Sequence, residues 1–151
     1  MVFGVIDKLL RAENNVHKFA EQMTKQEHID YWTGSAERDW KFIKQAFKIK
    51  QFVYALFFAH LVLEKLCKAH WVKDHQSNHP PKIHNLIYLI DNTQLKADAK
   101  ERAVLEKMNT FQLEGRYPDY KNKLYKSCDK KFSETTLKEV KEIRSWLLNS
   151  L

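Results

Sequence analysis

Glycine and proline are scarce in this sequence. It has three of each among 151 residues, whereas the two together make up about 12% of an average protein. The glycines stand far apart at positions 4, 34 and 115, so no stretch can form a glycine-rich phosphate loop or a dinucleotide fingerprint. A β-sandwich or barrel needs a turn about every 8–12 residues, and six glycine and proline residues are too few to supply those turns. The scarcity therefore favours a helical fold.

Long apolar runs and cysteine pairs are lacking too. The most apolar run, residues 52–63, contains His60 and is too short to cross a bilayer. The N-terminus has no basic leader and carries Asp7 and Lys8, so we expect no signal peptide. Cys67 and Cys128 form no Cys-x-x-Cys motif, which argues against a disulfide framework or a zinc motif. These features predict a cytoplasmic protein without a membrane-spanning segment.

Basic residues outnumber acidic ones, 26 to 19, giving a formal net charge of +7. With 44% hydrophobic and 30% charged residues, the composition is that of a folded soluble protein. The positive charge has two interpretations that the sequence leaves open. The charge either reflects a solvated, lysine-rich surface, or it serves to attract an anionic partner such as a nucleotide or a nucleic acid.

Apolar residues recur every three or four positions along most of the chain, which indicates amphipathic helices. The segments are 2–23, 32–47, 52–72, 83–91, 98–115 and 136 to the C-terminus. Asp98 is a predicted N-cap, and Thr136 with Glu139 predicts a capping box. Gly115 and Pro118 predict the end of the fifth helix. The fold class is thus all-α, an antiparallel up-and-down bundle of five to six helices.

Two segments carry candidate binding residues. Glu64 and Lys68, four apart on the most apolar helix, are either a surface ion pair or groups lining a polar cleft. In residues 116–131, six basic residues alternate with tyrosines. Arg116 can grip a phosphate in two places, and Tyr117 and Tyr120 can stack on a base. A solvated loop anchored by tyrosine explains this second segment equally well.

Signals for catalysis and for metals are weak. Four of the seven histidines lie between His70 and His84, but a proline pair interrupts them and no carboxylate completes a ligand set. Neither cysteine lies beside a histidine, and no Gly-x-Ser-x-Gly motif is present. We therefore predict no catalytic residue, no metal and no cofactor.

A series of short motifs covers residues 28–151. They are, in chain order, Tyr31-Trp32, Ser35-Ala36, Asp39, Tyr54-Ala55, Phe57, Glu64-Lys65-Leu66, Lys68-Ala69, a His-Pro-Pro loop, His84 with Leu86 and Leu89, and Arg116-Tyr117-Pro118-Asp119. This order resembles the HEPN domain, the "higher eukaryotes and prokaryotes nucleotide-binding" family. The resemblance divides the chain into an N-terminal helical extension, 1–27, and a HEPN-like bundle, 28–151.

The resemblance implies a homodimeric helical module that binds a nucleotide or RNA. It also implies a nucleotidyltransferase-type partner, often within a toxin–antitoxin pair. Many HEPN relatives are ribonucleases that use Arg, four to six residues, then His. This sequence has Lys121, Asn122 and Lys123 where that His would stand. The departure leaves the enzyme question open and favours a module without catalysis, although His60 or His84 could reach Arg116 through the fold.

The favoured interpretation is a HEPN-like module that binds nucleotide or RNA. Its predicted binding residues are Glu64, Lys65, Lys68, His84, Arg116, Tyr117, Asp119 and Tyr120. In it, Asp119 orients Arg116. One alternative is a toxin ribonuclease with a non-standard active site. The other is a protein–protein interaction module that docks a partner through the apolar helix 52–66.

Overall fold

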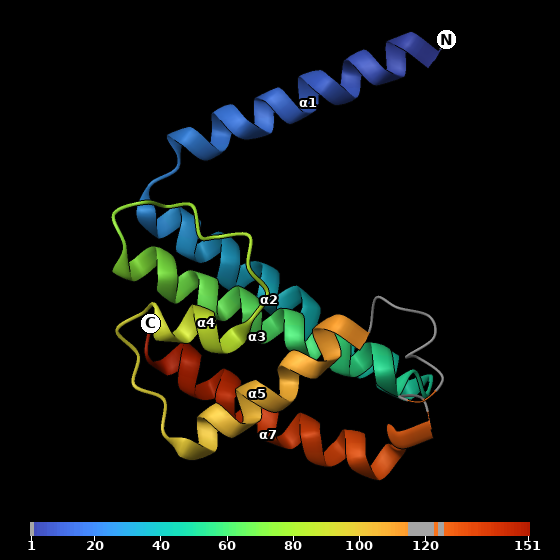
Figure 1. Cartoon of the computed structure of the whole chain (residues 1–151). Coiled ribbons are helices and arrows are strands. Elements are labelled where there is room, and N and C mark those ends of the chain that lie inside the picture. The colour runs from blue at the N-terminus through green and yellow to red at the C-terminus, as the bar shows by residue number, and fades with distance from the viewer. Residues whose placement is uncertain (1, 115–122, 124–125) are drawn as a thin grey trace.

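The computed structural model describes residues 2–114, 123 and 126–151. Their elements are α1 (Val2–Gln22), α2 (Lys25–Lys48), α3 (Phe52–Asp74), α4 (Leu86–Asp91), α5 (Ala99–Glu114) and α7 (Lys130–Asn149). The all-α prediction is confirmed. Helices α2, α3, α5 and α7 form the bundle, and α1 points away from it (Figure 1).

Helix α3 is the centre of the core. It packs against α2, α4, α5 and α7, and residues on nearly its whole circumference are buried, among them Leu56, Leu63 and Leu66. A helix that is apolar on all sides needs neighbours on all sides. The apolar residues of the predicted helix 52–72 therefore form the interior of the bundle.

Interactions at both ends of α2 and α3 hold these two helices antiparallel. Lys25, at the start of α2, donates to the carbonyls of Val72 and His75 at the end of α3, where its positive charge also suits the helix dipole. At the other end, Lys50 takes the left-handed conformation (φ 59°) in the tight turn from α2 to α3. The two helices are thus held antiparallel.

Three predicted helix starts are wrong. The second helix starts at Lys25 rather than at residue 32, because Thr24 and Glu27 form a capping box there. The last helix starts at Lys130 with Asp129 as its N-cap, so Thr136 lies inside α7 and is buried. In each case a capping side chain upstream of the apolar pattern sets the boundary.

The third error concerns α4, which begins at Leu86 rather than at residue 83 because Asn85 caps it. The prediction for Asp98 is confirmed by its geometry. Its carboxylate accepts from the Glu101 amide at 2.7 Å, directly before α5. Helix α5 is described as far as Glu114, and the predicted stop at Gly115 and Pro118 lies outside the described residues.

Candidate functional site

Three polar side chains form a row on the otherwise apolar helix α3. His60, Glu64 and Lys68 are spaced four residues apart, so they follow one another along a single helix face. All three are buried. Together with His84 from the segment between α3 and α4, they make up what we call the α3 cluster.

The ion pair of the α3 cluster lies inside the protein. Lys68 Nζ is 2.7 Å from Glu64 Oε1, and the side chains are only 8% and 7% exposed. Lys68 Nζ also lies 5.4 Å from the ring centroid of Trp32 on α2, a cation–π contact. The interpretation of Glu64 and Lys68 as a surface ion pair is therefore wrong.

His84 completes the cluster from outside α3. Its Nδ1 lies 3.1 Å from each carboxylate oxygen of Glu64. Its backbone carbonyl accepts a hydrogen bond from His60 Nε2 at 3.0 Å. This hydrogen bond holds the segment after the proline pair against α3. The His84 side chain is 39% exposed. It is the member through which the cluster meets solvent.

Electrostatics keep Glu64 ionised. Burial raises the pKa of Glu64, but the hydrogen bond and charge of Lys68, joined by those of His84, outweigh it and place the pKa below its usual value. The neighbouring thiol behaves in the opposite way. Burial raises the pKa of Cys67 to about 12, so this thiol stays protonated and is no nucleophile.

The contact between His84 and Glu64 determines which hydrogen bonds the imidazole ring can make. A carboxylate only accepts hydrogen bonds, so the Nδ1 of His84 is the nitrogen that donates to Glu64. Among the described residues, the other ring nitrogen, Nε2, has no hydrogen-bond partner and can take one from an external group. Across the described residues, no set of three His, Cys, Asp or Glu side chains gathers in a way that could hold a metal ion.

Comparison with known families decides what kind of protein this is. A sequence model described as the HEPN domain matches residues 29–151. The chain belongs to the HEPN family. It is therefore a helical module with a role related to nucleotides or RNA. No curated protein and no solved structure gives a significant match to this HEPN chain. In the described part of the chain, no helix has the length and apolar character to span a bilayer.

The predicted binding residues of this HEPN domain separate into three groups. Glu64, Lys68 and His84 come together in the α3 cluster. Lys65 points elsewhere and pairs with Asp39 at 2.6 Å. The remaining ones, all in the tyrosine-rich segment, lie outside the described residues. They are Arg116, Tyr117, Asp119 and Tyr120.

Two residues in or beside the α3 cluster are absent from the predicted set. His60 could have been found from its spacing, since it precedes Glu64 by four residues on the same helix. Trp32 lies on another helix, and no local pattern links it to Lys68. Only the packing of α2 on α3 brings these two side chains together.

Proposed function

We propose that this HEPN module binds a phosphate group of a nucleotide or of RNA at the exposed edge of the α3 cluster. The observation that carries the proposal is the His84 ring. Glu64 holds its Nδ1 side, and the ring is exposed enough to be reached from solvent. When the ring is protonated, both nitrogens donate, Nδ1 to Glu64 and Nε2 to a phosphate oxygen.

Within this proposal, Glu64 and Lys68 are positioning residues. The ammonium of Lys68 is already engaged by Glu64, so it balances the buried carboxylate while the carboxylate orients His84. The direct contacts are then His84 and Arg116, with Tyr117 and Tyr120 stacking on a base and Asp119 orienting the arginine. Lys65 makes a smaller contribution, because Asp39 already binds its ammonium.

Binding measurements with matched variants test the proposal. ATP and a single-stranded RNA oligonucleotide are titrated into the wild type and into His84→Ala and Arg116→Ala. Losing one charge-assisted contact should weaken binding by about tenfold or more. The controls are His79→Ala, in the same loop as His84, and Arg38→Ala, at an exposed position of α2. Wild-type affinity in both site variants would refute the proposed site.

A second candidate function, ribonuclease activity, is favoured by the pairing of His84 with Glu64. Imidazole held by a carboxylate is a common general base. At Nε2, His84 would take the proton of a ribose 2′-hydroxyl. The oxygen would then attack the adjacent phosphorus to form a 2′,3′-cyclic phosphate, while the P–O5′ bond breaks and the departing 5′-oxygen takes a proton from water. Expression of wild type and His84→Ala, with growth and intact RNA as readouts, tests this. Arrest that persists in His84→Ala would argue against this role.

For the partner, we propose a second copy of the chain, bound through an aromatic surface on α2 and α3. Phe42 is 45% exposed and packs against Phe58 with ring centroids 4.6 Å apart, and Tyr54 is 38% exposed. Most other apolar side chains of 52–66, such as Leu56 and Leu63, are buried in the chain's own core. The surface left for a nucleotidyltransferase-type partner on this helix is accordingly narrow.

Light scattering after gel filtration tests the homodimer. Phe42→Glu places a charge in the aromatic surface and should convert dimer to monomer. Tyr88→Glu is the matched control, because Tyr88 is similarly exposed (48%) but lies on α4. A wild type that runs as a monomer at the highest concentration tested would refute the proposed dimer.

A further inference from the structure

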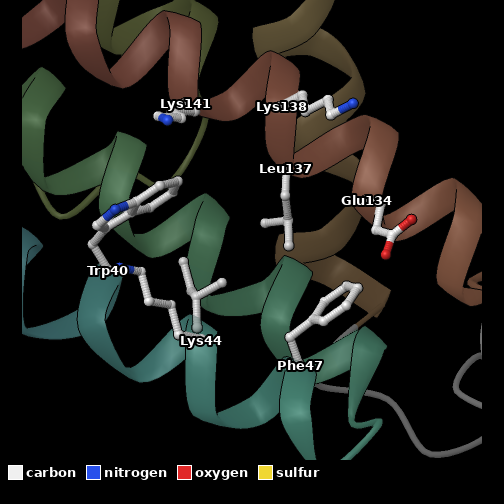
Figure 2. A pocket seen from close by; sticks show the side chains of 8 residues that line it. Trp40, Lys44, Phe47, Glu134, Leu137, Lys138 and Lys141 are labelled. Carbon is white, nitrogen blue, oxygen red and sulfur yellow. The ribbon is translucent and has the colours of Figure 1, made fainter.

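A second surface, away from the α3 cluster, is an apolar groove between α2 and α7 with a volume of about 620 Å³. We call it the α2–α7 groove. Its apolar residues are Trp40, Ile43 and Phe47 of α2 and Leu137 of α7. In Figure 2, Leu137 points from α7 toward the α2 side chains. The nucleotide proposal makes no use of this surface.

The rim of the groove is basic. Lys44, Lys138 and Lys141 stand around the apolar residues, against one acid, Glu134. All three lysines are exposed, and none forms an ion pair with a carboxylate of the described residues. They therefore present uncompensated positive charge beside an apolar floor.

The same character continues past the end of the groove. An adjoining hollow of about 430 Å³ shares Phe47 with it and has Phe52 as a further apolar wall. Lys48, Lys50 and Lys130 line this hollow. The hollow therefore continues the combination of an apolar surface and exposed lysines beyond the end of the α2–α7 groove.

The length of the groove suits one face of a helix. Along α2 it extends from Trp40 to Phe47 and along α7 from Glu134 to Lys141, eight residues on each wall. From the first to the last of eight residues, an α-helix rises about 10 Å. That is also the distance over which a docked helix places anchors at i, i+3 or i+4, and i+7. Toward the other end, Arg144 of α7 packs on the Trp40 ring at 5.0 Å.

We propose that the α2–α7 groove binds an acidic amphipathic helix of a partner protein. Apolar side chains on one face of that helix fill the space between Trp40, Phe47 and Leu137, and its flanking Asp and Glu residues pair with the lysine rim. Aliphatic groups on the floor, from Ile43 and Leu137, favour aliphatic anchors over nucleic-acid bases, which stack on aromatic rings.

The chain's own α1 is a poorer occupant, although its apolar face is exposed, for example at Leu9 and Phe19. It carries three basic residues, Lys8, Arg11 and Lys18, and three acidic ones, Asp7, Glu13 and Glu21. Such a helix brings no net negative charge to the lysine rim. Charge complementarity therefore selects an acidic partner.

Fluorescence anisotropy with the full chain tests this inference. The probe is a labelled peptide of about 14 residues with Leu at i, i+3, i+7 and i+10 and mostly Glu and Ala elsewhere. We expect saturable binding that Lys138→Glu/Lys141→Glu weakens by about tenfold or more. Lys82→Glu/Lys96→Glu makes the same charge change at exposed lysines outside the groove and should bind like the wild type.

Three further probes separate the other occupants. A scrambled peptide of equal composition tests the apolar register, a peptide of residues 2–22 tests α1, and an oligo-uridine tests nucleic acid. Equal binding of the scrambled peptide would overturn the inference. So would unchanged binding by Lys138→Glu/Lys141→Glu, or tighter binding of either the 2–22 peptide or the RNA at the groove. Circular dichroism of the variants checks that these exposed substitutions leave the helices intact.

Discussion

Glu64 shows how strongly one buried carboxylate can organise its surroundings. It sits on a helix that is apolar on nearly all sides, yet two cationic or donating groups reach it, Lys68 at 2.7 Å and His84 at 3.1 Å. An isolated charge in such a place costs several kcal/mol. The contacts offset that cost, and they also hold His84 in one orientation.

Removing the ammonium should therefore be costly. In Lys68→Met the Glu64 carboxylate keeps its burial and loses its main partner, and we expect the free energy of unfolding to fall by about 3 kcal/mol. Lys100→Met is the control, because its pair with Glu142 is exposed (71% and 62%) and its loss should change stability much less. Urea denaturation measures both. A loss in Lys68→Met as small as the control's would show that the pair is hydrated in solution.

At the scale of elements, capping side chains decide where helices begin. The apolar pattern of the second helix starts at Trp32, but the helix itself starts at Lys25, because Thr24 and Glu27 satisfy backbone amides that would otherwise lack partners. The early start brings Lys25 to the end of α3. The capping box thus contributes to the pairing of the two helices.

Thr24→Ala should lower the free energy of unfolding by about 1 kcal/mol, because the amide of Glu27 loses its acceptor at 3.2 Å. Thr110→Ala, an exposed position inside α5, makes the same chemical change without removing a cap. It should change stability by about 0.5 kcal/mol or less. Thermal or urea unfolding by circular dichroism compares the two. Equal effects would mean that the cap contributes nothing.

For the whole molecule, His70 links the central helix to the end of the chain. Its Nε2 donates to the carbonyl of Leu147 at 2.7 Å, in the last turn of α7 where carbonyls lack helical partners. Burial lowers the pKa of His70, and this hydrogen bond offsets only part of that effect. The neutral ring is therefore the form that the fold requires.

The sign of the resulting pH dependence follows from linkage. Because the folded pKa lies below the unfolded value near 6.5, the unfolded chain takes up the proton more readily. The stabilisation is complete above that value and is lost as the pH falls toward the folded pKa. Unfolding free energies at pH 7.5 and 5.5 should differ less in His70→Gln, which keeps a donor but does not titrate. His17→Gln, exposed on α1, should match the wild type, and an unchanged slope in His70→Gln would refute the role of His70.

The sequence by itself determined the helical class, and it placed Glu64 and Lys68 on one face of the most apolar helix. These follow from local spacing, since turns need breakers and helix neighbours recur every three or four residues. Only the tertiary structure decided that this pair is buried, that Lys65 turns to Asp39 instead, and that His84 joins Glu64 from 20 residues away. The α2–α7 groove likewise exists only because α2 and α7 both pack against α3 and lie beside one another. Contacts between distant segments depend on how the helices pack against one another, and the spacing of residues along the chain does not reveal this packing.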